Sequence, residues 1–179
     1  MNRCIIITVI LVIALLQACG DKDNPSNSGT VTINNELSGT GPYYALGFSI
    51  THGKKVSTLS APLDVVTILE DNDVDMTVRM LYFTCENFEN SFFRYGEYAD
   101  AATAKSTFDN LKSFTEGTWT ATADSVRANQ IWLFRTSGTS YAKIRVISTH
   151  TEIKTGMVFP YAECTFEYVY QPDGTKLFP

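Results

Sequence analysis

Two apolar segments joined by a short turn constrain the fold of this sequence more than any other feature. Residues 130–136 (QIWLFRT) contain the unbroken apolar run IWLF, and residues 141–148 (YAKIRVIS) alternate between apolar side chains and the basic Lys143 and Arg145. The four residues between them (SGTS) have the composition of a turn. Alternation at every second position is typical of a strand with one face on a core. The pattern therefore predicts an antiparallel hairpin.

Similar strand patterns recur along the chain, in residues 30–34, 43–51, 56–59, 65–69, 76–84, 91–95 and 162–170. Turn-forming residues such as Gly, Pro, Asn and Asp separate many of these segments. We therefore expect a mainly β (α+β) domain, built as an antiparallel sheet or a small β-sandwich.

One segment, residues 100–114, has the periodicity of a helix. Ala104, Phe108 and Leu111 fall on one face, and Asp100 is well suited to accept hydrogen bonds from the first amides as an N-cap. We expect a single helix packed against the sheet.

The first 18 residues have the organisation of a secretory signal. Arg3 is the only charged residue before Asp21, and residues 4–16 (CIIITVILVIALL) form an apolar run. This run is shorter than the roughly 20 apolar residues that a transmembrane helix needs.

Residues 16–19 (LQAC) resemble the lipobox of bacterial lipoproteins. The resemblance implies cleavage before Cys19 and acylation of Cys19, for example with palmitate, which anchors the chain in a membrane. Gly20, in place of Asp, implies the outer membrane, and the acidic residues 21–23 (DKD) resemble the export signals of surface lipoproteins in Bacteroidetes. We therefore expect a signal peptide (1–18), a disordered tether (19–28) and one β-rich domain (29–179) in the cell envelope.

Charge and cysteine content narrow the functional classes. After the leader, 13 basic and 19 acidic residues remain, and the net charge of −6 argues against nucleic acid as a partner. Two cysteines remain for the folded domain, Cys85 and Cys164. In an oxidising compartment they form either a disulfide or two buried thiols, and spacing does not decide between these alternatives.

Three parts of the chain occur in the same order as similar segments of a known family. They are residues 47–56 (GFSITHGKKV), residues 72–87 (NDVDMTVRMLYFTCEN), and the pair 131–148 and 164–174 (CTFEYVYQPDG). Together they resemble the HmuY-type haem-binding lipoproteins of Bacteroidetes. The resemblance implies a β-rich protein that captures haem and works with a TonB-dependent receptor. Val74 stands where the family has Trp, and residues 88–129, which correspond to the haem-ligand region, contain no His or Met. No ligand is carried over.

The candidate haem ligands elsewhere in the chain are His52, His150, Met76 and Met80. For each, the alternative is an ordinary turn, surface or core residue.

A weak calcium candidate is the acidic stretch with Asp71, Asp73 and Asp75. An EF-hand loop starting at Asp71 would need Gly and Glu where Met76 and Tyr82 stand, so a solvated loop is the alternative.

The sequence does not predict an enzyme. It has no Gly-x-Ser-x-Gly or His-Glu-x-x-His motif, and the carboxylates Glu163 and Glu167 are expected on a solvated outer face. Aromatic residues near loops, among them Tyr43 and Tyr95, form either part of the core or a surface for a glycan or a protein. We expect a lipid-anchored binding protein, for haem or another nutrient; the alternatives are a structural or adhesion accessory and, last, a hydrolase.

Overall fold

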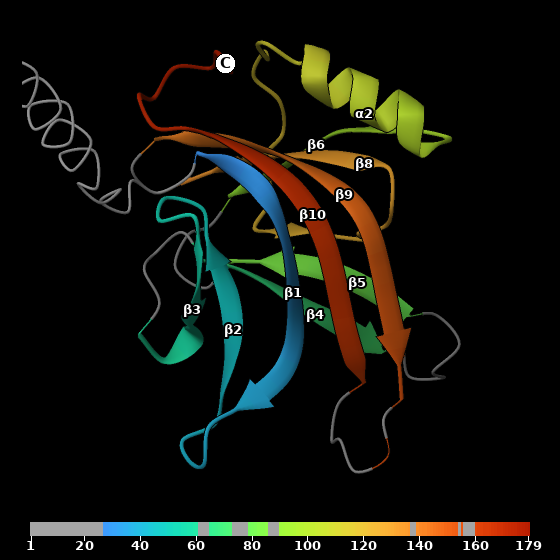
Figure 1. The fold of residues 1–179 in the computed structure, drawn as a ribbon. Coiled ribbons are helices and arrows are strands. Elements are labelled where there is room, and N and C mark those ends of the chain that lie inside the picture. The colour runs from blue at the N-terminus through green and yellow to red at the C-terminus, as the bar shows by residue number, and fades with distance from the viewer. Residues whose placement is uncertain are drawn as a thin grey trace, which may run out of the picture.

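The computed structural model describes residues 27–60, 65–72, 79–85, 90–136, 139–153, 155 and 160–179. Cys19, Met76, Asp73, Asp75, the signal peptide and most of the tether lie outside these residues. The described chain is mainly antiparallel β with one helix, as predicted (Figure 1). Its elements are β1 (Ser28–Ser38), β2 (Tyr44–Ser49), β3 (Lys54–Ser57), the 3-10 turn η1 (Thr58–Ser60), β4 (Val65–Asn72), β5 (Arg79–Thr84), β6 (Phe92–Glu97), α2 (Ala101–Asn110), β7 (Thr122–Ala123), β8 (Gln130–Arg135), β9 (Tyr141–Glu152) and β10 (Tyr161–Gln171).

The strands form one strongly curved sheet in the order β6-β8-β9-β10-β1-β2-β4-β5-β7, with β3 paired to β2. The two ends of this order meet, because Phe92 at the start of β6 forms a bridge with Thr120 just before β7. Their amides and carbonyls exchange hydrogen bonds of 2.9 and 2.8 Å. The sheet is thereby nearly closed into a barrel-like sandwich, which leaves little unpaired strand edge at this seam.

The interior is filled by the inward side chains of the strands. Phe166 of β10 contacts the rings of Phe48 and Phe83, with ring centroids 5.9 and 5.7 Å apart. Along β10, Cys164, Phe166 and Tyr168 are buried while the residues between them are partly exposed, so the predicted alternation is confirmed. Apolar residues at every second position thus supply the main core.

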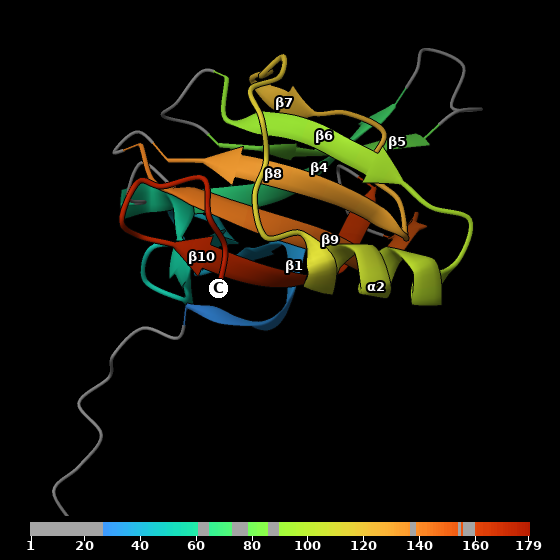
Figure 2. The same cartoon turned by 90° about the horizontal axis from the view of Figure 1, so that it is seen from above.

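A second, smaller core lies outside the sheet, between β8, β9, helix α2 and the C-terminal segment (Figure 2). Its largest members are Phe108, Phe114, Tyr141 and Phe178. Asp100 is the N-cap of α2, as predicted, and its carboxylate accepts a hydrogen bond of 2.8 Å from the Thr103 amide. The outer face of the hairpin is therefore covered by the helix.

The helix is shorter than predicted. It ends at Asn110, because Leu111 adopts ψ of 89°, outside the helical region. The chain then continues in extended form, which still brings Phe114 into the second core. Periodicity alone could not separate this arrangement from one longer helix, since both bury the same side chains.

Several strands extend beyond their predicted ends. β1 runs from Ser28 to Ser38, and β9 continues to Glu152 because Tyr161 of β10 lies opposite to it. β4 includes Asp71, which lies opposite Met80 of β5 in the register. Asp71 is thus a strand residue rather than the first residue of a loop. Backbone hydrogen bonds to a neighbouring strand can keep polar residues in a β-strand even where their own strand propensity is low. No helix among the described residues is long and apolar enough to cross a membrane.

Candidate functional site

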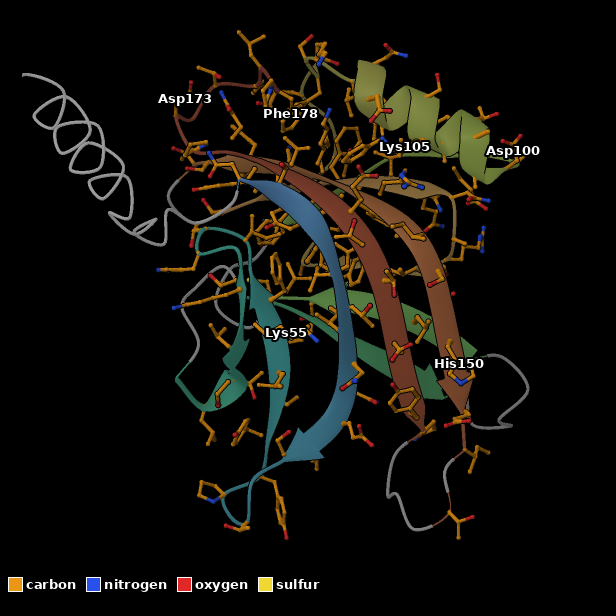
Figure 3. All side chains as sticks on the ribbon, viewed as in Figure 1. Lys55, Asp100, Lys105, His150, Asp173 and Phe178 are labelled. Carbon is orange, nitrogen blue, oxygen red and sulfur yellow. The ribbon has the colours of Figure 1, made fainter. Side chains whose placement is uncertain are left out.

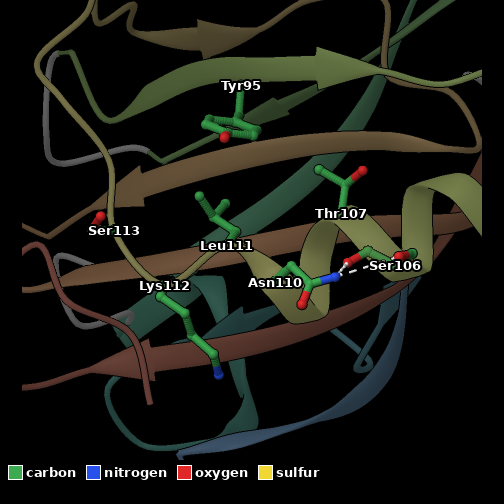
Figure 4. A pocket seen from close by; sticks show the side chains of 7 residues that line it. All are labelled: Tyr95, Ser106, Thr107, Asn110, Leu111, Lys112 and Ser113. Carbon is green, nitrogen blue, oxygen red and sulfur yellow. Dashed lines mark hydrogen bonds between the residues drawn. The ribbon is translucent and has the colours of Figure 1, made fainter.

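An open groove between β6 and the last turn of α2 is the best candidate for a binding site (Figure 4). We call it the helix groove. Its volume is about 380 Å³, within the range of small-molecule sites. Seven residues line it: Tyr95, Ser106, Thr107, Asn110, Leu111, Lys112 and Ser113.

A β-bulge places Tyr95 in the helix groove. In the pairing of β6 with β8, Arg94 lies opposite Trp132 and Gly96 opposite Ile131, so Tyr95 is the extra residue. Bulges re-aim side chains at functional positions. Tyr95 projects from β6 toward α2 with 40% of its surface exposed. A Cβ at Gly96 would lie 2.7 Å from the Tyr98 hydroxyl oxygen, so a larger residue here would displace the Tyr98 side chain.

Buried Lys143 holds the opposite wall of the groove. It projects outward from β9 beneath α2, with only 2% of its surface exposed. Its Nζ donates hydrogen bonds to the carbonyl oxygens of Phe108 at 2.7 Å and Leu111 at 3.0 Å. Both carbonyls belong to the end of the helix, where intrahelical donors become scarce, and the Phe108 carbonyl also accepts a longer hydrogen bond of 3.3 Å from the Leu111 amide. A positive charge at this position also complements the helix dipole.

The surroundings of Lys143 disfavour its charged form. Burial, with a smaller contribution from the positive charge of Lys112, lowers the pKa of Lys143 to about 8. The negative charges of Asp109 and Glu167 act in the opposite direction. The Nζ atom also lies 4.7 Å from the centre of the Phe108 ring. Lys143 is therefore an internal support of the helix end rather than an exposed group.

The segment after the helix is fixed by the C-terminal residues. Ser113 forms a β-bridge with Leu177, and the Phe178 amide donates a hydrogen bond of 2.8 Å to the Lys112 carbonyl. The Lys112 Nζ donates to the Pro179 backbone oxygen at 2.8 Å. Figure 2 shows this C-terminal segment running beside the chain that follows α2. The end of the helix groove that contains Lys112 and Ser113 is thus held by two segments that are far apart in sequence.

The charged groups near the groove are paired with one another. Glu167 of β10 accepts hydrogen bonds from the Arg145 Nε and Nη2 at 3.0 and 2.8 Å, and its other oxygen lies 3.5 Å from the Lys105 Nζ. The hydrogen bond that Lys105 donates to the Asp109 carboxylate raises the pKa of Lys105 and lowers the pKa of Asp109. None of these four residues lines the groove. The lining can donate and accept hydrogen bonds, but it holds no carboxylate or imidazole to move a proton.

A second open groove, of about 370 Å³, lies at the seam where β6 and β7 meet. Arg94 and Asp124 line it together with Thr122, whose hydroxyl donates to Asp124 at 2.7 Å. Two aromatic residues also line this seam groove: Trp132, which is almost completely buried, and Phe93, which is partly buried.

Of the candidate haem ligands, the described residues include both histidines, and the structure places them on different parts of the sheet. His52 lies in the turn after β2, and its Nδ1 is 2.8 Å from the Ser49 hydroxyl. His150 lies on β9, away from the helix (Figure 3). Three strand pairings separate β9 from β2, which is about 14 Å across the sheet. Neither histidine lines the helix groove or the seam groove. Met80 lies in β5.

The two predicted carboxylates also have separate partners. Glu163 accepts a hydrogen bond of 2.6 Å from the Tyr161 hydroxyl, whereas Glu167 accepts from Arg145. Burial and the neighbouring Glu163 raise the pKa of Tyr161 to about 12. Both glutamates lie on the outer side of β10, as expected, but Glu167 belongs to the network under the helix rather than to a solvated face.

Cys85 and Cys164 are both buried thiols, and no disulfide joins them. Burial in the apolar interior raises the pKa of the Cys164 thiol far above its ordinary value, so this thiol is unreactive. In the described part of the chain, no group of three or more His, Cys, Asp or Glu residues is arranged to hold a metal ion.

The sequence indicated only part of the helix groove. It singled out Tyr95 as one of several aromatic residues with two alternative roles, and the structure places Phe92 in the core and Tyr95 at the surface. It did not indicate Thr107, Asn110 or Ser113. Their only local signal is that they fall off the apolar face of the helix or follow its end.

No protein-family model matches this chain, and comparison with curated proteins finds no match.

Proposed function

We propose that this protein is a non-enzymatic, lipid-anchored binding protein of the cell envelope that takes a small ligand in the helix groove. The proposal has two parts, anchoring through Cys19 and binding between β6 and α2. The observation that carries the second part is the groove itself, whose seven lining residues provide an exposed aromatic ring and several hydrogen-bonding groups.

The anchor is supported by the lipobox-like residues 16–19 and by the polar stretch that follows them. Stable anchoring needs more than one acyl chain, which lipoprotein maturation at Cys19 would supply. β1 begins at Ser28, and the Asn27 carbonyl accepts a hydrogen bond from the Tyr170 amide. A tether of residues 19–26 would therefore lead directly into the sheet. Gly20 supports the outer membrane as the location.

A binding role is supported over a catalytic one because the groove lining includes no carboxylate and no histidine. Haem is not the ligand that we propose for the helix groove, because neither His52 nor His150 lines it. The resemblance to HmuY-type lipoproteins supports a TonB-dependent receptor as the membrane partner. Co-purification with such a receptor from cross-linked cells tests this part.

Labelling with a palmitate analogue tests the anchor. We expect the wild-type protein to incorporate the label and to remain in membranes after a carbonate wash. Cys19→Ser should lose both properties, because it removes the sulfur that carries the lipid. Cys4→Ser is the matched control, since it changes a cysteine of the predicted leader and should leave labelling unchanged. Wild-type labelling of the Cys19→Ser protein would disprove the anchor.

A further inference from the structure

The helix groove combines an aromatic ring with uncharged polar groups, and we propose that it binds a ring of an uncharged saccharide. The inference rests on the proposed function, because it names the ligand class of the same groove. It is carried by three properties of the lining: the exposed face of Tyr95, the hydrogen-bonding groups opposite to it, and the restriction of charge to a single residue, Lys112, whose ammonium group already donates to the Pro179 backbone oxygen.

Tyr95 provides the surface for stacking. The face of an aromatic ring carries partial negative charge, and it attracts the polarised C–H groups on the apolar face of a pyranose ring. Tyr95 is 40% exposed and projects over the groove from β6, with Leu111 on the opposite side (Figure 4). Most of the large aromatic residues near the groove, including Phe108 and Phe114, are buried in the second core. Tyr95 therefore offers its ring to a ligand rather than to the protein interior.

The opposite wall provides hydrogen-bonding groups suited to sugar hydroxyls. Ser106, Thr107 and Ser113 contribute hydroxyl groups that both donate and accept. The Asn110 Nδ2 donates to the Ser106 carbonyl oxygen at 2.9 Å, which orients the amide and leaves its Oδ1 as an acceptor. Each sugar hydroxyl is likewise a donor and an acceptor. The hydroxyl and amide groups of the groove can therefore pair with sugar hydroxyls while all of these groups are uncharged.

Charge distinguishes a neutral sugar from the other small polar ligands. Lys112 is the only charged residue in the lining, and its Nζ donates to the Pro179 backbone oxygen. An anion would therefore meet an ammonium group that is already bonded, and a cation would meet no carboxylate. The seam groove differs, because it contains both Arg94 and Asp124. The helix groove is the one that suits an uncharged ligand.

The walls are held in place before any ligand arrives. Lys143 fixes the carbonyls of Phe108 and Leu111, and the bridge between Ser113 and Leu177 fixes the chain that follows. Such preorganisation lowers the entropy that a ligand must lose in ordering the site. We therefore expect measurable binding although the groove is open.

The test uses the full-length protein in a detergent without a sugar headgroup, such as lauryldimethylamine oxide. An array of neutral and acidic glycans identifies candidates, and saturation-transfer NMR with the best neutral disaccharide measures binding. We expect a neutral glycan to bind, and Tyr95→Ala to weaken its affinity by about tenfold or more, as loss of a stacking ring does. Tyr95→Phe keeps the ring and should stay within about threefold of the wild type.

Tyr43→Ala is the matched control, because Tyr43 is 64% exposed but lies before β2, far from α2 in the sheet order. It should bind as the wild type does. The inference is overturned if no neutral glycan binds, if binding survives Tyr95→Ala unchanged, or if only acidic glycans bind. Palmitate labelling is measured on the same preparations. If the protein is labelled with palmitate but binds no saccharide, the saccharide proposal is disproved and the proposed anchor at Cys19 stands.

Discussion

In the first half of β9, residues 141–146, the inner and outer faces of the strand are both buried, but by different means. On the inner face Ala142, Ile144 and Val146 are completely excluded from solvent by other apolar side chains. On the outer face Lys143 and Arg145 are 2% and 8% exposed beneath α2. Apolar side chains need only a close-packed neighbour, whereas a buried charge needs a bonded partner.

Each outer charge has such a partner. Lys143 donates to two helix carbonyls, and Arg145 binds Glu167 through two nitrogens. Apolar packing on the inner face is not directional. The bonds on the outer face are directional, and they orient the helix. This difference explains why the helix groove has rigid walls although it lies outside the main core.

The largest effect is expected on the inner face. Phe166→Ala should lower the free energy of unfolding by about 3–5 kcal/mol, because Phe166 is completely buried and contacts Phe48 and Phe83. Urea denaturation measures the change. Phe166→Leu, which keeps most of the volume, should lose less than half as much. An Ala variant as stable as the Leu variant would show that this ring cluster is not central.

On the outer face we expect an intermediate effect from Lys143→Met. The variant keeps an apolar chain of similar length but removes the ammonium that donates to the carbonyls of Phe108 and Leu111. Phe108 retains only the Leu111 amide as a donor, and we expect a cost of about 1–3 kcal/mol at pH 7. Lys105→Met is the control, because Lys105 is exposed and should change stability much less. Equal stability of Lys143→Met and the wild type would contradict the support that we assign to Lys143.

The outer face of β9, unlike the inner face, should make the stability of the protein depend on pH through Lys143. The pKa of Lys143 is lowered to about 8 in the fold and is about 10.4 in the unfolded chain. Between these values the unfolded state binds more protons, so the contribution of Lys143 to stability rises with pH. The wild type should therefore gain stability relative to Lys143→Met between pH 8 and pH 10, by at most about 3 kcal/mol. Equal slopes in urea titrations of the two proteins would disprove this.

The smallest effect concerns the start of the helix. Asp100→Ala removes the acceptor of the Thr103 amide, so that amide should exchange its hydrogen faster. Asp100→Asn retains an N-cap oxygen and should exchange nearly as slowly as the wild type. Hydrogen-exchange NMR measures both. Unchanged protection of Thr103 in the Ala variant would show that the cap does not hold the first turn.

Local patterns predicted much of the fold. The alternation in residues 141–148 correctly separated Ile144 from Lys143, and Asp100 was correctly predicted as the start of the helix. The same patterns ended β9 and β1 too early and extended the helix beyond Asn110. These errors occur where the partner strand or the second core, rather than the local sequence, decides the conformation.

The candidate site was less predictable for the same reason. Tyr95 and Asn110 are 15 positions apart and face each other only because a bulge in β6 and the end of α2 meet across β8. The alternation in β9 placed Lys143 and Arg145 on the side opposite the core, but no local pattern shows which element will cover that side of a strand. Lys143 became a buried support only when α2 packed over it.

The sequence by itself determined the strand-rich class, the start of the helix and the inward side of the central hairpin. All three depend on periodicity and on neighbouring residues in the chain. Only the tertiary structure decided the closure of the sheet at Phe92 and Thr120, the burial of Lys143 and the formation of the helix groove. Each of these depends on contacts between segments distant in sequence, whose geometry is set by the packing of the whole domain.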